Sequence, residues 1–194
     1  MKTISRIERG ENRMDIFMPM STTARHNRIA MTLSGTILDL LRKKEVYALS
    51  EECSLVYWGR KTETTSFRLV AVPEIEDIAK FKDSIIDDLY YVQPDFLLFK
   101  HNPYVENKRQ TRIAGCPDLI VEIWSDGNSK NDRAFLQNLY STSDVTEHWY
   151  IEQDSNEVDC YLGRGKIKNQ SLNDILHTRS GLAFDLRYLA IEGR

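Results

Sequence analysis

Hydrophobic residues near the N-terminus recur with a helical period. Between Ser21 and about Lys44 they stand three or four positions apart and form one face of a 3.6-residue repeat, made of Ile29, Leu33, Ile37, Leu40 and Leu41. Hydroxyl side chains at positions 21–23 can cap the start of such a helix, and basic residues at 42–44 suit its negative end. The pattern predicts a helix over about residues 21–44, with His26 on its inward face.

Apolar runs farther along predict strands. Short runs at 46–49, 54–58 and 67–72 have β character, and the acidic segment 74–89 fits a short helix or an insertion. Two longer runs, 90–99 and 119–124, are almost continuously apolar and are interrupted by Asp95 and by Glu122. Strands that are apolar on both faces lie in the middle of a sheet, with helices covering each side. We expect these two runs to be adjacent central strands.

The second half of the chain predicts a helix and a hairpin. Ser129 and Asp132 form a capping pair for a helix that reaches about Ser141. Runs at 147–151 and 158–162 flank a turn-forming segment, and further apolar stretches follow at 172–176 and 182–189. This order predicts an α/β fold: one domain over residues 1–190, with a mixed β-sheet flanked by helices. Residues 191–194 match a common engineered protease site and are left out of the expected domain.

Composition narrows the function classes. The 194 residues are 41% hydrophobic and 28% charged, which is typical of a globular protein, and no run approaches the ~20 apolar residues of a membrane span. Without a secretory signal pattern, a cytoplasmic location is expected, and three cysteines (Cys53, Cys116 and Cys160) predict reduced thiols. A net charge of −3 excludes a polycation, so nucleic-acid binding would depend on a local basic segment, best represented by residues 100–115.

Glu122 is the residue that most needs a chemical explanation. An ionised carboxylate inside an apolar strand costs several kcal/mol unless it is paired or binds a metal. Asp95 is a second isolated carboxylate in the neighbouring run, and two adjacent strands would bring both to one point. Oxygen ligands of this kind suit Mg²⁺ or Mn²⁺. The alternative is that each carboxylate forms an ordinary ion pair with an arginine such as Arg25 or Arg133.

Asp118 and His26 each have two possible roles, one in the site and one in the structure. Asp118 shares a strand face with Glu122 but stands ~13 Å from it, so the two cannot bind one ion directly. It could serve the site or simply hold the start of the strand. His26 could be a further ligand or orient a water molecule, although a lone histidine on an apolar helix face is more often a core residue.

Several segments together resemble a known family. They are Gly115-Cys-Pro-Asp-Leu-Ile-Val-Glu-Ile-Trp-Ser125, then Asp132 and Tyr140, then Val145-Thr-Glu-His-Trp-Tyr-Ile-Glu152. This pattern is similar to the Uma family of restriction-endonuclease-like proteins, and His26 and Pro94-Asp95 match its early histidine and first Pro-Asp. The resemblance, over residues 20–190, implies the PD-(D/E)XK nuclease fold and Mg²⁺-dependent cleavage of DNA. Asp95 and Glu122 would be the metal ligands, whereas Tyr140 and Trp149 are expected to pack in the core.

The chain departs from the family at the catalytic lysine. The superfamily usually has it two residues after the glutamate, where this chain has Trp124, and the Uma relatives have it on the following helix, where this chain has Leu136. Lys130 is a nearby candidate for the missing cation. Two functions therefore stay open: a metal-dependent DNA endonuclease, or a non-catalytic nucleic-acid-binding or assembly module on the same fold. Because cutting both strands commonly requires a dimer, a second copy of the chain is a candidate partner.

Overall fold

The computed structural model describes residues 23–43, 45–50, 54–59, 88–92, 94–100, 104–105, 112–114, 117–142, 145–163 and 165–191. The predicted strand at 67–72, most of the acidic segment at 74–89, and Cys53 and Cys116 lie outside these ranges. Cys160 is a buried free thiol, as predicted. In the described ranges, no helix is both long and apolar enough to cross a membrane.

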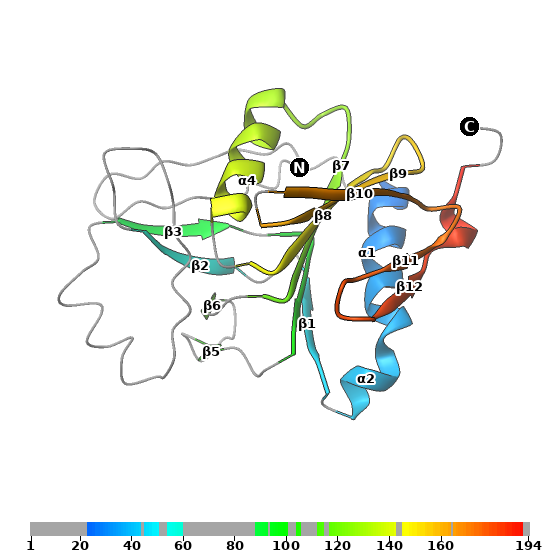
Figure 1. Cartoon of the computed structure of the whole chain (residues 1–194), viewed down its shortest axis with the longest axis horizontal. Coiled ribbons are helices and arrows are strands. Elements are labelled where there is room, and N and C mark those ends of the chain that lie inside the picture. Colours follow the sequence, from blue (N-terminus) through cyan, green and yellow to red (C-terminus); the bar gives the residue numbers. More distant parts are fainter. Residues whose placement is uncertain are drawn as a thin grey trace.

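A six-stranded mixed sheet forms the centre of the molecule (Figure 1). In spatial order its strands are β1 (Tyr47–Ser50), β4 (Phe96–Phe99), β7 (Leu119–Trp124), β8 (Glu147–Glu152), β9 (Glu157–Leu162) and β10 (Gly165–Ser171). The β7–β8 pair is parallel and the other pairs are antiparallel. The predicted α/β fold, the adjacency of the two buried runs and the β8–β9 hairpin are confirmed. The polar edge strand β10 was not predicted.

The run at 90–99 is two strands in two sheets, not the single strand that the sequence predicted. Its first part belongs to β3 (Asp88–Val92), which joins a four-stranded sheet with β2 (Ser54–Gly59), β6 (Arg112–Ala114) and β5 (Tyr104–Val105). The chain then bends at Asp95, directly after Pro94, before β4 begins. Proline has no N–H to donate to a strand ladder, which accounts for the break. Strands β5 and β6 lie within the basic segment 100–115, and apart from Lys100 its other residues lie outside the described ranges.

The first helix ends earlier than its apolar pattern predicted. The chain forms α1 (Ala24–Thr36) and a short α2 (Leu38–Arg42), separated at Ile37 by non-helical backbone angles (φ −105°, ψ 15°). The side chain of Thr23 caps α1 by accepting the N–H of His26 at 3.0 Å. The second predicted helix is α4 (Lys130–Thr142), and the Ser129 hydroxyl accepts the N–H of Asp132 at its start, as expected.

Alternation along β7 divides its side chains between two layers. Leu119, Val121 and Ile123 join the main core together with apolar residues of α1 and β8. The intervening residues point to the other face of the sheet. There the hydroxyl of Tyr140, on α4, donates a hydrogen bond to Glu122. The remaining elements are β11 (Ile175–His177), β12 (Ala183–Asp185) and η1 (Arg187–Leu189), which lie beside α1 in Figure 1. The backbone of Ile191 exchanges two hydrogen bonds with the side chain of Asn156.

Candidate functional site

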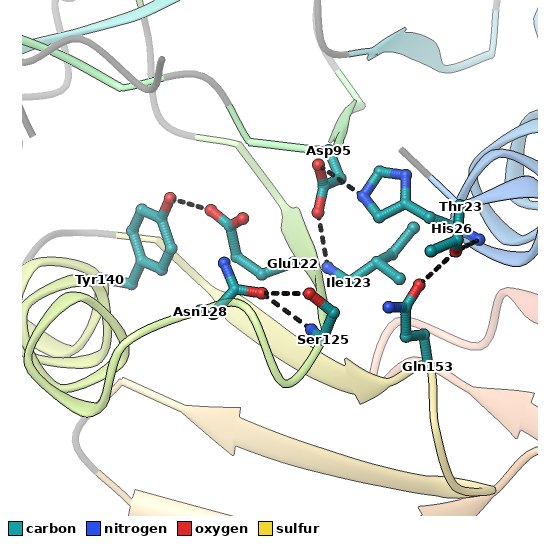
Figure 2. Close-up of polar contacts among 9 residues, drawn as sticks. All are labelled: Thr23, His26, Asp95, Glu122, Ile123, Ser125, Asn128, Tyr140 and Gln153. Atoms are coloured by element: carbon teal, nitrogen blue, oxygen red, sulfur yellow. Dashed lines mark hydrogen bonds and ion pairs between the residues drawn. The ribbon is translucent and has the colours of Figure 1, made fainter. Parts of the chain in front are cut away.

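The register between β4 and β7 brings Asp95 next to Glu122. Phe96 pairs with Val121, Leu97 with Ile120 and Leu98 with Leu119. One further step along this antiparallel register sets Asp95 opposite Glu122. The Oδ2 atom of Asp95 accepts the backbone N–H of Ile123 at 2.6 Å, which ties its carboxylate to β7 (Figure 2). The two carboxylates that the sequence singled out therefore meet at the end of two buried strands.

His26 contacts the other oxygen of Asp95. The distance from His26 Nε2 to Asp95 Oδ1 is 3.1 Å, and both residues are buried. The position of His26 follows from the first turn of α1, because Thr23 caps that turn and its hydroxyl also donates to Gln153 Oε1 at 2.6 Å (Figure 2). Gln153 follows β8 directly. The helix that carries His26 is thus fixed to the same end of the sheet as the acidic pair.

Glu122 is almost fully buried, with 2% of its surface exposed. The hydroxyl of Tyr140 on α4 donates to its Oε1 at 2.5 Å (Figure 2). Burial raises the pKa of Glu122 well above its usual value, the negative charge of Asp95 raises it further, and the Tyr140 hydrogen bond lowers it. Ionising both carboxylates is therefore unfavourable in the protein alone, and a bound cation would relieve that repulsion.

The donor set fits a magnesium-like ion that keeps part of its water shell. Mg²⁺ usually binds proteins through one or two carboxylates and retains several waters. Asp95 and Glu122 offer two carboxylates, and in the described ranges no group of three or more His, Cys, Asp or Glu side chains could hold a metal ion. Water or substrate oxygens would have to complete the coordination. The pair is therefore compatible with Mg²⁺ or Mn²⁺, not with a site made wholly of protein ligands.

Asp118 and Lys130 lie apart from the acidic pair. Asp118 Oδ2 accepts the N–H of Lys100 at 2.7 Å, and its own N–H donates to the Leu98 carbonyl at 2.8 Å. These bonds hold β4 and β7 together at the end of β7 far from Glu122. Lys130 is the first residue of α4 and is exposed, and within the described part of the chain it contacts neither carboxylate.

The two expected lysine positions are filled by buried apolar side chains. Trp124 stacks on Tyr150 with ring centroids 4.2 Å apart, and Leu136 is 2% exposed on α4. A described cation beside Trp124 is Arg133, whose guanidinium carbon lies 4.8 Å from the centre of the Trp124 ring. Arg133 forms an ion pair with Glu152 and donates to the Ser125 carbonyl at 2.6 Å.

The alternative of ordinary arginine ion pairs at the acidic site is wrong for the arginines that the sequence suggested. Arg133 is paired with Glu152, and Arg25 donates to the carbonyl of Ser155 at 3.4 Å. Tyr140 is fully buried, as predicted, and it also donates its hydroxyl to Glu122, which the sequence did not predict. A buried tyrosine hydroxyl usually has a hydrogen-bond partner, and this rule could have suggested the contact. Trp149 packs in the core as predicted and donates to Glu147 at 2.7 Å.

Comparisons with known proteins agree on the family and the fold. The sequence profile of the Uma2 family, described as a putative restriction endonuclease, matches residues 80–191, more than half of the chain. No curated protein matches the sequence. Among solved structures, a crystal structure described as a putative nuclease belonging to DUF820, from Anabaena variabilis, superposes with a TM-score of 0.55 at 15% identity. The match covers 91% of this chain and 87% of that one, and it supports the fold. The chain belongs to the Uma2 family.

Proposed function

We propose that this protein is a metal-dependent endonuclease that hydrolyses DNA phosphodiester bonds, with Mg²⁺ or Mn²⁺ bound by Asp95 and Glu122. The observation that carries the proposal is the pair of buried carboxylates, which the β4–β7 register sets opposite each other. Burial raises the pKa of Glu122, the charge of Asp95 raises it further, and such an arrangement is typical of functional sites. The family description supports a nuclease, and the chemistry of the pair supports the metal.

The protein's own residues would prepare the two ligands. His26 and the N–H of Ile123 each hold one oxygen of Asp95, which fixes the orientation of this carboxylate. Tyr140 holds Oε1 of Glu122 and fixes the rotamer of that side chain. When bound, the metal would offset the charge that develops on the phosphate and help to activate the attacking water. Hydrolysis joins the water oxygen to phosphorus and breaks the bond from phosphorus to the leaving sugar oxygen, which takes up a proton.

Plasmid nicking tests this proposal. Purified protein should nick supercoiled DNA in Mg²⁺ or Mn²⁺ and should lose that activity in EDTA. Glu122→Gln and Asp95→Asn keep the shape of each side chain but remove the charge, and each should reduce nicking by at least ~100-fold. Glu147→Gln is the matched control, because Glu147 is a buried carboxylate on the next strand that bonds Trp149 and the N–H of Arg179. Nicking that persists in the Asp95→Asn, Glu122→Gln double variant would contradict the proposal.

A non-catalytic nucleic-acid-binding or assembly module is the second candidate, because Trp124 and Leu136 fill both positions where a catalytic lysine is expected. Calorimetry separates the two functions. Heat of binding with Mg²⁺ or Mn²⁺ that disappears in Glu122→Gln would favour the enzyme. A folded protein that takes up neither ion at millimolar concentration would favour the module. The molar mass in solution, with and without DNA, would test whether two copies act together.

A further inference from the structure

Two buried N–H donors lie together at the end of β7. In the part of the chain that the structure describes, the indole Nε1–H of Trp124 and the Nε–H of Arg133 have no hydrogen-bond acceptor. The hydroxyl of Tyr150, whose ring stacks on Trp124, has no partner either. A buried donor without an acceptor costs free energy, so native proteins keep few of them, and each calls for an explanation. Donors gathered in one place are complementary to an anion.

Arg133 is held at this place by three contacts. Its guanidinium lies over the Trp124 ring, its Nη2 donates to the Ser125 carbonyl, and its Nη1 pairs with the carboxylate of Glu152. Glu152 is also the register partner of Trp124 on the adjacent strand. The guanidinium is thus already paired with one anionic group, the carboxylate of Glu152. Both members of this ion pair reach solvent, because 22% of the Arg133 side chain and 32% of the Glu152 side chain are exposed.

The donors lie on the same side of the sheet as the acidic pair. Trp124 is two residues after Glu122 on β7, so both side chains point to the α4 face with Cα atoms about 7 Å apart. Tyr150 is the register partner of Glu122. Arg133 shares α4 with Tyr140, which binds Glu122. The N–H donors and the carboxylates therefore belong to the same face of the sheet, two residues apart along β7.

We propose that Trp124 and Arg133 bind a non-bridging oxygen of the phosphodiester positioned at Asp95 and Glu122, with the phosphate replacing Glu152 on the guanidinium. This inference rests on the proposed function and names the residues that would hold the substrate's charge. Phosphoryl transfer depends on positioning and on cationic donors that meet the developing negative charge. Arg133 would supply the positive charge, from a position one helical turn before Leu136. The indole N–H of Trp124 would supply a neutral hydrogen-bond donor.

Four single variants and two matched controls test the inference. Trp124→Phe removes the indole N–H but keeps a ring for Tyr150 and Arg133 to contact, and Trp149→Phe is its control, since that indole already has Glu147 as acceptor. Arg133→Gln removes the charge, and Arg133→Lys keeps it but loses the planar fork. Glu152→Gln frees the guanidinium. Its control is Glu157→Gln, which removes the same charge from an exposed position on β9.

Binding of a fluorescent DNA duplex, followed by anisotropy in EDTA over a range of salt, gives the first readout. Arg133→Gln should weaken binding and lower the slope of log affinity against log salt by about 0.9, the value for one lost phosphate contact. Arg133→Lys should restore the slope. Glu152→Gln should tighten binding several-fold more than Glu157→Gln does. A purely structural ion pair predicts no such gain, so equal effects of these two variants would overturn the inference.

Thermal melting and nicking give the second readout. Trp124→Phe should lower the melting temperature less than Trp149→Phe does, because its lost donor is unpaired, and yet it should weaken DNA binding and slow nicking. Trp149→Phe should melt earlier and leave affinity unchanged. If wild-type protein never nicks DNA, the proposed endonuclease is wrong, and the binding measurements still decide the subsite. DNA affinity that is the same in Trp124→Phe, Arg133→Gln and the wild type would overturn it.

Discussion

His148 should make the protein lose stability in mild acid. It is fully buried on β8, where its ring stacks on Tyr161 with centroids 5.2 Å apart. Neither ring nitrogen has a hydrogen-bond partner among the described residues. Burial lowers its pKa from 6.5 to about 4, because the charged imidazolium would lose its hydration without gaining a partner. The folded protein therefore keeps this side chain neutral over a pH range in which the unfolded chain binds a proton.

The sign and size of the effect follow from linkage. Between pH 6.5 and pH 4 the unfolded state takes up more protons than the folded state, so stability falls as the pH falls through this window. Each pKa unit corresponds to about 1.4 kcal/mol, so the shift to about 4 gives a total of roughly 3 kcal/mol, most of which is already lost at pH 4.5. Above pH 7 the contribution is close to zero.

His148→Phe isolates this contribution. The variant keeps an aromatic ring against Tyr161, cannot be protonated and removes two unpaired nitrogens, each of which costs about 1–3 kcal/mol when buried. Urea unfolding of both proteins at pH 7 and pH 4.5 gives the free energies. The stability of the variant relative to wild type should rise by roughly 2–3 kcal/mol between pH 7 and pH 4.5, since all other titrating groups are common to both.

His177→Phe is the control, because His177 is exposed on β11 and meets water in both states. Its substitution should change the stability by a similar amount at the two pH values. Two results would refute the reasoning about His148. One is a stability difference between His148→Phe and wild type that does not change with pH. The other is a variant that loses stability in acid more steeply than the wild type.

Three further predictions concern the acidic pair and the helix that faces it. Glu122→Gln should raise the melting temperature of the metal-free protein, and by more at pH 8 than at pH 5, because a raised carboxyl pKa costs stability as the pH rises above its unfolded value. Tyr140→Phe should lower the free energy of unfolding by about 1–3 kcal/mol and also slow nicking, because the buried Glu122 loses its hydrogen-bond donor. Urea unfolding measures the first effect and the plasmid assay measures the second. Thr23→Ala should cost about 1 kcal/mol in the same unfolding assay through loss of the cap and of the bond to Gln153, and it should weaken metal binding in calorimetry by loosening His26. A Thr23→Ala protein with unchanged metal affinity would show that the cap does not position the histidine.

The sequence predicted the centre of the fold because the signal there is strong. Strands that are apolar on both faces are stable only in the middle of a sheet that is covered on each side. The pairing of β4 with β7 therefore followed from their composition. Asp95 and Glu122 then stood out as the charges that such strands cannot easily hold. Once the strands were adjacent, their meeting needed only a register that sets one beside the other.

The parts that the sequence did not predict depend on distant contacts. Pro94 is a local signal for a break between residues 90–92 and β4, but nothing local shows that residues 90–92 join another sheet. The edge strand β10 is mostly polar and forms because β9 supplies a hydrogen-bonding partner. The bond from Tyr140 to Glu122 joins residues 18 positions apart, so periodicity alone could mark the tyrosine as inward-facing but could not name its partner.

The alternation along β7 has a consequence for how this protein can change over time. Positions 119, 121 and 123 serve the apolar core, whereas Glu122 and Trp124 face α4 and belong to the proposed site. One six-residue strand thus holds two sets of side chains with separate surroundings, interleaved residue by residue. Libraries that vary only the α4-facing positions could search for new activities while the opposite face keeps the protein folded. Stabilising substitutions on the core-facing positions could in turn offset whatever those searches cost.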